Sequence, residues 1–173
     1  IGVGGQWSNV STITINYEAI PKPTEIECDA SVTASGGLGV YRLTMNMGTR
    51  GGDAGIKYTA YGVPDKFVLT DSDGNLLTQT KYVGSQETPI SGGTKQMDVY
   101  EYNNETKEFV NTGRKETVIV DPDDQEVKPN GEGELTYNKQ HTDSAQVITI
   151  SVYGTQTGTA WALSGICPTG IDE

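Results

Sequence analysis

Residues 147–152 of this chain are Val-Ile-Thr-Ile-Ser-Val, and this stretch decides the fold class. Its apolar members Ile148, Ile150 and Val152 alternate with threonine and serine. Apolar and polar side chains that alternate at every second position are typical of a β-strand with one buried face. No long stretch of the chain has the 3.6-residue spacing of an amphipathic helix. We therefore expect an all-β protein.

Similar short stretches, rich in threonine, valine, isoleucine and tyrosine, recur along the chain with turn signals between them. Glycine and asparagine mark these turns because they adopt positive φ angles at little cost. About ten short strands separated by such turns predict an antiparallel β-sandwich, and jelly-roll-like topology is typical of this pattern. The expected strands are Glu25–Thr33, Tyr41–Met47, Gly55–Tyr61, Lys66–Thr70, Leu76–Tyr82, Gln96–Tyr102, Glu116–Val120, Gly133–Tyr137, Gln146–Tyr153 and Thr159–Ser164.

An N-terminal segment, residues 1–23, is set off from the rest of the chain. Its apolar side chains share one parity, which predicts a strand. Pro21 and Pro23 then interrupt strand pairing and favour an extended linker. We expect this arm to contact a neighbouring subunit, followed by a sandwich domain over residues 24–168 and a flexible tail over residues 169–173. The arm residues expected at this interface are Trp7, Ile13, Ile15 and Tyr17, and packing of the arm on its own domain is the alternative.

The charge balance is strongly acidic. The chain has 12 basic and 23 acidic residues among 173, which gives a formal charge of −11. This balance argues against a nucleic-acid partner, which requires clustered lysine and arginine, and against binding to anionic membranes. No apolar run is long enough for membrane insertion. The chain begins at Ile1 rather than methionine, which indicates a processed mature end or a fragment of a longer protein.

Two cysteines, Cys28 and Cys167, lie near opposite ends of the expected main domain. Their spacing matches no zinc, haem or redox motif. Two interpretations stay open. The cysteines either form a disulfide that joins the first strand of the domain to the last, or they are two buried thiols.

Two acidic turns are candidate calcium sites, because carboxylate oxygens are the ligands that calcium prefers. One turn contains Asp71, Asp73 and Asn75, and the other contains Asp121 and Asp123. The first lacks the glutamate that closes an EF-hand loop, and Asp-Gly strongly favours a hairpin turn. We expect both to be turns and no cofactor, with calcium as the alternative.

Aromatic residues offer candidate ligand contacts, since an aromatic ring can stack on a sugar. Tyr100 and Tyr102 share one face of their strand, and they either pack inward or form a surface patch. Trp161 lies between two alanines within a strand, and we expect it in the core. Asp65 follows a proline at the start of a strand, where it caps backbone N–H groups or holds a cation.

Catalytic signatures are lacking in the sequence. There is one histidine, His141, in a polar loop, and no nucleophile elbow, phosphate-binding loop or metalloprotease helix. A glycosidase would need two carboxylates facing each other across a cleft, and no pair stands out. We therefore expect a non-enzymatic protein.

Three segments carry a family resemblance: Gly39-Val40-Tyr41, the run from Ile56 to Phe67 with Tyr-Gly-Val-Pro-Asp-Lys-Phe at its end, and Gly158-Thr159-Ala160-Trp161 with Cys167-Pro168. They resemble a β-sandwich module of bacteriophage virion proteins and bacterial surface proteins. The resemblance spans about Leu38 to Pro168 and implies display, adhesion or capsid decoration without a catalytic residue. The chain departs from the pattern in residues 103–129, where we expect an inserted hairpin.

These observations lead to two hypotheses. The first is a structural or interaction protein of an extracellular or virion assembly, whose partners are further copies of the chain or other virion or surface proteins. The second is a carbohydrate-binding or adhesion module of a larger secreted protein, with a glycan as the partner. Both place the protein outside the cell, on a virion or on a cell surface.

Overall fold

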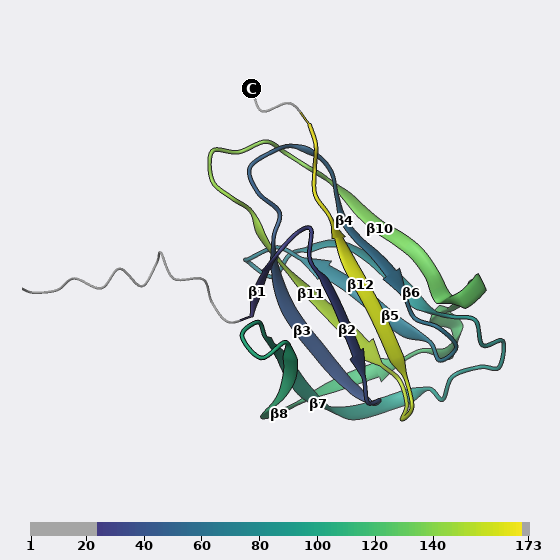
Figure 1. Cartoon of the computed structure of the whole chain (residues 1–173). Coiled ribbons are helices and arrows are strands. Elements are labelled where there is room, and N and C mark those ends of the chain that lie inside the picture. Colours follow the sequence, from purple (N-terminus) through teal and green to yellow (C-terminus); the bar gives the residue numbers. More distant parts are fainter. Residues whose placement is uncertain (1–23, 171–173) are drawn as a thin grey trace, which may run out of the picture.

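Two β-sheets packed face to face form the domain (Figure 1). The computed structural model describes residues 24–170, and the predicted arm with Trp7, Ile13, Ile15 and Tyr17 lies outside the described residues. Between residues 24 and 170 there is no α-helix, only two short 3₁₀ turns. The all-β sandwich that the alternating pattern predicted is therefore confirmed.

The larger sheet has eight strands and the smaller sheet has four. Along the larger sheet the order is β8-β7-β3-β11-β5-β6-β9, with β1 also beside β3, and along the smaller sheet it is β10-β4-β12-β2. Most neighbours are antiparallel, whereas β1–β3, β3–β7 and β6–β9 are parallel. The strands of the larger sheet are β1 (Glu25–Glu27), β3 (Gly39–Asn46), β5 (Asp65–Thr70), β6 (Leu76–Gly84), β7 (Gly93–Asn103), β8 (Glu108–Val120), β9 (Gln125–Val127) and β11 (Val147–Gly154). Those of the smaller sheet are β2 (Ser31–Ser35), β4 (Gly52–Thr59), β10 (Glu132–Lys139) and β12 (Ala160–Ile166).

The core lies between the two sheets. Strand β11 is central in the larger sheet, between β3 and β5, and its Ile148, Ile150 and Val152 are fully buried. Trp161 of β12 meets them from the smaller sheet and is 1% exposed. The sequence prediction that Trp161 is a core residue is confirmed.

Two strand predictions differ from the structure. The stretch expected as one strand, 25–33, is divided into β1 and β2, which lie in different sheets, because a turn closes between them with a hydrogen bond from Ala30 N to Glu27 O. Strand β8 begins at Glu108, eight residues earlier than expected. Most of its side chains are exposed or half-buried, so its sequence lacks clear alternation. Residues 103–129, where an inserted hairpin was expected, contain β8 and β9 instead; β8 pairs back on β7, whose strand precedes this range, and β9 pairs with β6.

Strand β7 contributes to two hydrophobic clusters, one on each of its faces. Met97 and Val99 belong to the second cluster, whereas Tyr102, of the opposite parity, is buried in the main core. The register against β8 shifts between Asp98 and Tyr100, where one residue of β7 lies opposite residues 112–114 of β8. The bulge therefore lies in β8, and β7 alternates regularly. The second cluster consists of Val40, Tyr82, Ile90, Met97, Val99 and Val120.

Candidate functional site

A disulfide joins Cys28 to Cys167. Their Cα atoms are 5.3 Å apart although 139 positions separate them in the sequence. Cys28 lies in the turn before β2, and Cys167 directly follows β12, the partner of β2. The bond therefore fastens the outermost strand of the smaller sheet to its neighbour.

The first acidic turn is the hairpin between β5 and β6. One carboxylate oxygen of Asp71 accepts hydrogen bonds from the backbone N atoms of Asp73 and Asn75, both at 2.9 Å, and the other accepts from Asn75 Nδ2. Donation from the Asn75 amide holds the pKa of Asp71 below its ordinary value. The carboxylate thus stabilises its own turn.

The second acidic turn is also structural. Asp121 caps a 3₁₀ turn by accepting a hydrogen bond from Asp123 N at 2.9 Å, and Asp124 forms an ion pair of 2.7 Å with Lys66. Within residues 24–170 no group of three or more histidine, cysteine, aspartate or glutamate side chains is arranged to hold a metal ion.

Asp65 is a buried carboxyl group at the start of β5, with no exposed surface. Its two oxygens lie 2.7 and 2.9 Å from the hydroxyl of Thr159, at the beginning of β12. Burial raises the pKa of Asp65 well above its ordinary value, against the opposing effect of this hydroxyl. The sequence suggested that Asp65 caps backbone N–H groups, but its described partner is a side-chain hydroxyl from another strand.

Replacing Asp65 by asparagine should stabilise the protein at neutral and alkaline pH. The folded state raises the pKa of this carboxyl, which means that it holds the proton more tightly than the unfolded state does. The stabilisation of the fold by the protonated carboxyl is therefore complete below the ordinary pKa and is lost as the pH rises through the raised value. Each unit of that shift corresponds to about 1.4 kcal/mol. We expect Asp65→Asn to melt at a higher temperature than the wild type at pH 8, with a difference that disappears near pH 4.

A matched control for this experiment is Asp71→Asn. The pKa of Asp71 is lowered, so its contribution is present above the ordinary pKa and is lost as the pH falls. Asp71→Asn should therefore have the opposite sign and lower the melting temperature at pH 8. Equal pH profiles for the wild type and Asp65→Asn would contradict the assigned environment of Asp65.

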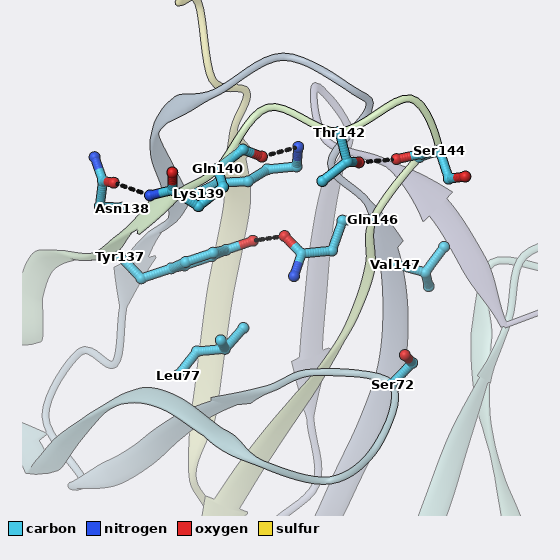
Figure 2. A pocket seen from close by; sticks show the side chains of 11 residues that line it. Ser72, Leu77, Tyr137, Asn138, Lys139, Gln140, Thr142, Ser144, Gln146 and Val147 are labelled. Atoms are coloured by element: carbon cyan, nitrogen blue, oxygen red, sulfur yellow. Dashed lines mark hydrogen bonds between the residues drawn. The ribbon is translucent and has the colours of Figure 1, made fainter.

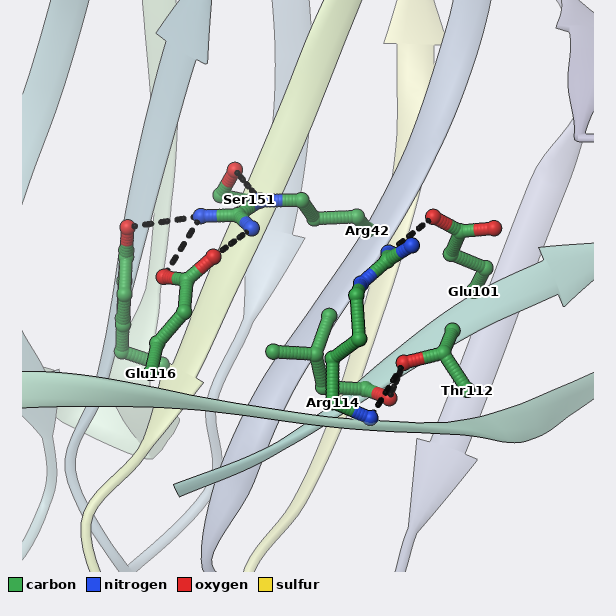
Figure 3. Close-up of polar contacts among 8 residues, drawn as sticks. Arg42, Glu101, Thr112, Arg114, Glu116 and Ser151 are labelled. Carbon is green, nitrogen blue, oxygen red and sulfur yellow. Dashed lines mark hydrogen bonds and ion pairs between the residues drawn. The ribbon is translucent and has the colours of Figure 1, made fainter. Parts of the chain in front are cut away.

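A polar network holds the β7–β8 hairpin against the outer face of the larger sheet (Figure 3). Arg42 of β3 forms a bidentate ion pair with Glu116 of β8. It also donates a hydrogen bond of 3.0 Å to Oγ of Ser151 on β11. On the hairpin itself, Arg114 pairs with Glu101 at 2.7 Å. The bonds of Arg42 join the hairpin to β3 and β11, which are distant from it in sequence, so they position the hairpin.

A polar groove of about 620 Å³ lies between the β5–β6 turn and the loop after β10 (Figure 2). Its apolar surface comes from Leu77 and the ring of Tyr137, whose hydroxyl donates to Gln146 Oε1 at 3.0 Å. The rest of its wall combines amide and hydroxyl side chains, among them Gln140 and Thr142, with Lys139, Ala145 and Val147. This mixture of one aromatic ring with amides is the composition that a sugar-binding groove uses.

Tyr100 and Tyr102 do not form the surface patch that the sequence left open. Tyr102 is 5% exposed, and Tyr100 stacks on Tyr41 with ring centroids 4.8 Å apart. Phe109 of β8 packs edge-on against Tyr41 at 5.5 Å. These rings close the side of the sandwich, because Tyr100 and Tyr102 share the inward face of β7.

The outer edge of β2 carries unused backbone hydrogen-bonding groups. Hydrogen bonds from Gly36 N to Thr159 O and from Gly165 N to Ala30 O show that the even-numbered residues of β2 pair with β12. In an antiparallel ladder the alternate residues direct their N–H and C=O groups to the other side. Ser31, Thr33 and Ser35 therefore face away from β12, and among the described residues no strand lies there.

A second groove, of about 450 Å³, runs beside this edge. One wall is β2 itself, through Thr33 and Ala34, and the other is the start of β8. Its floor is formed by Tyr41, Tyr100 and Phe109, the aromatic rings that close the side of the sandwich. A polar edge and an aromatic floor thus lie side by side.

The sequence did not single out β2 or Phe109. A strand at the edge of a sheet and a strand at its centre can have the same sequence. Only the position of β2 in the sheet shows that one of its sides is free to pair. One signal was available: residues 31–35 contain no charge and no proline, the two devices that most often protect an edge strand.

No family model matches this chain. Comparisons with curated proteins and with solved structures also found no match. Within the part of the chain that the structure describes, no helix has the length and apolar character needed to cross a membrane. The geometry of the domain itself is therefore the basis for a functional proposal.

Proposed function

We propose that this protein is a non-enzymatic subunit of an extracellular assembly, such as a virion decoration, a fibre or a surface filament. Its N-terminal arm adds as a strand to a sheet edge of a neighbouring copy. Strand addition takes its affinity from main-chain hydrogen bonds and its specificity from pockets for alternate side chains. The observation that carries the proposal is the open edge of β2, which offers both features.

The disulfide also supports this proposal. Structural disulfides persist in oxidising surroundings such as the extracellular space and virion surfaces. Two described carboxyl groups with shifted pKa values, Asp65 and Asp71, have structural partners. A domain that is closed by a disulfide, and in which these side chains form hydrogen bonds within the domain, suits a role in assembly.

Acidic substitutions on the apolar face of the arm should abolish assembly. In a docked strand, Ile13 and Ile15 would face the neighbouring domain, and an unpaired buried carboxylate costs several kcal/mol. We expect Ile13→Asp/Ile15→Asp to weaken association by roughly 100-fold or more. The measurement is the native mass of the full chain by light scattering across a range of concentrations.

The control is Thr12→Asp/Thr14→Asp, which adds the same charge to the opposite face of the same segment. This variant should assemble like the wild type. A wild-type chain that is a folded monomer at every concentration would contradict the proposal. That outcome would favour the second candidate function, a carbohydrate-binding module, for which the groove beside Tyr137 is the supporting observation.

A further inference from the structure

We infer that the acceptor of the arm is the outer edge of β2 in a neighbouring copy, with residues Thr12–Tyr17 as the docked strand. This inference rests on the proposed function and deepens it by naming the surface on which assembly depends. Both partners are segments of this chain.

Hydrogen bonding supports the choice of β2. Ser31, Thr33 and Ser35 direct their N–H and C=O groups outward at every second residue, which is the spacing that an added strand requires. Their side chains are exposed on the outer face of the sheet, whereas Val32 points into the core. A strand of about six residues would pair with all three.

The groove beside β2 supports the identity of the docked strand. Neighbouring strands lie about 4.8 Å apart, with side chains of the same parity on the same face. A strand docked on β2 would therefore direct one set of alternate side chains inward, next to Val32 and over the aromatic floor. The arm has such a set in Ile13, Ile15 and Tyr17. These residues would cover Tyr41, Tyr100 and Phe109.

The other sheet edges are less suitable acceptors. Strand β10 carries Glu132 and Glu134, strand β8 carries several charged residues and a bulge, and β9 has only three residues. Charges, bulges and short length are the features that keep edge strands from pairing. Strand β2 has five residues without charge or proline.

Charge also favours contact between these two segments. Each copy has a net charge of −11, so two copies repel each other over most of their surfaces. Residues 1–17 contain no charged side chain, and neither do residues 31–35. A neutral strand that docks on a neutral edge avoids direct contact between like charges.

The prolines favour a neighbouring copy over the same domain. Proline fixes its own φ and holds the preceding residue extended, so Pro21 and Pro23 together favour an extended backbone over residues 20–23. Thr24 begins the described chain beside Thr44 in the larger sheet, whereas β2 lies in the smaller one. Such a linker favours docking of the arm on β2 of a neighbouring copy over β2 of the same domain.

Amide hydrogen exchange on the unmodified full chain tests this inference residue by residue. The amides of the even-numbered residues of β2 are protected by β12 in any state. In the assembly, the amides of Ser31, Thr33 and Ser35 should exchange at least 100-fold more slowly than in the Ile13→Asp/Ile15→Asp monomer. Equal exchange of these three amides in both samples would overturn the inference and leave the proposed function intact, with the arm docked elsewhere.

A matched pair of proline variants provides a second test. Thr33→Pro removes an outward N–H without removing a bond to β12, and it should leave the chain monomeric by mass. The control is Thr136→Pro on β10. The hydrogen bond from Ala60 N to Gly131 O shows that the odd-numbered residues of β10 pair with β4. The backbone N–H of Thr136, an even-numbered residue, therefore also faces outward. Thr136→Pro should assemble like the wild type. Assembly of Thr33→Pro at wild-type strength would overturn the inference. Slow exchange of the amides of Ser31, Thr33 and Ser35 in a sample that is monomeric by mass would also overturn it.

Discussion

Replacing Cys28 and Cys167 by serine is expected to lower the free energy of unfolding by about 5 kcal/mol, since the disulfide closes a loop of 139 positions. In the chain-entropy model the gain comes from restricting the unfolded state, and it increases with loop length. A domain of this size has a total stability of about 5–15 kcal/mol. Loss of this bond should therefore remove a large share of the stability of the fold.

Urea denaturation under oxidising and reducing conditions measures this effect. The wild type in reductant and the double serine variant should unfold at the same urea concentration, well below the oxidised wild type. Adding reductant to the serine variant is the control and should change nothing. Identical midpoints for the oxidised wild type and the serine variant would contradict the stabilising role of the bond.

Replacing Trp161 by alanine should cost roughly 3–5 kcal/mol, because the fully buried indole leaves a large cavity. Its ring centroid lies 5.6 Å from Phe109, 6.0 Å from Tyr41 and 6.2 Å from Phe67, each in an edge-on arrangement. The indole thereby joins β12 of the smaller sheet to β3, β5 and β8 of the larger one. Chemical denaturation should show the loss as a lower midpoint.

Two controls separate cavity formation from a general effect of substitution. Trp161→Phe keeps an aromatic ring at the centre of the cluster and should cost less than the alanine variant. Ile119→Ala removes an apolar side chain that is 76% exposed, and it should change stability by no more than about 0.5 kcal/mol. A larger loss for Ile119→Ala than for Trp161→Ala would contradict the description of the core.

Local alternation predicted the strands whose two faces differ most. Strand β11 is the clearest case, because Ile148, Ile150 and Val152 face the core and the threonine and serine between them do not. The turn at Asp71 was also predictable, since Asp-Gly favours a hairpin. In β8 the pattern was weak because few of its side chains are buried. The bulge at residues 112–114 of β8 could not be predicted, since it depends on the partner strand.

The candidate site was harder to predict than the fold. Residues 31–35 alternate like a central strand, and only the order of strands in the sheet shows that β2 has a free side. The aromatic floor brings Tyr41, Tyr100 and Phe109 together from three strands. The carboxyl of Asp65 likewise finds Thr159 94 positions away. Such contacts depend on the topology of the whole domain, which no local pattern contains.

The position of the disulfide has a mechanical consequence. Cys28 lies close to the first described residue and Cys167 close to the last, so a pulling force applied at Thr24 and Gly170 passes through the bond between the two sulfur atoms. Residues 29–166 carry none of this tension. Reduction would release roughly 450–500 Å of extended chain from the same residues. An oxidised subunit therefore acts as an almost inextensible tether, and a reduced one as a long elastic chain.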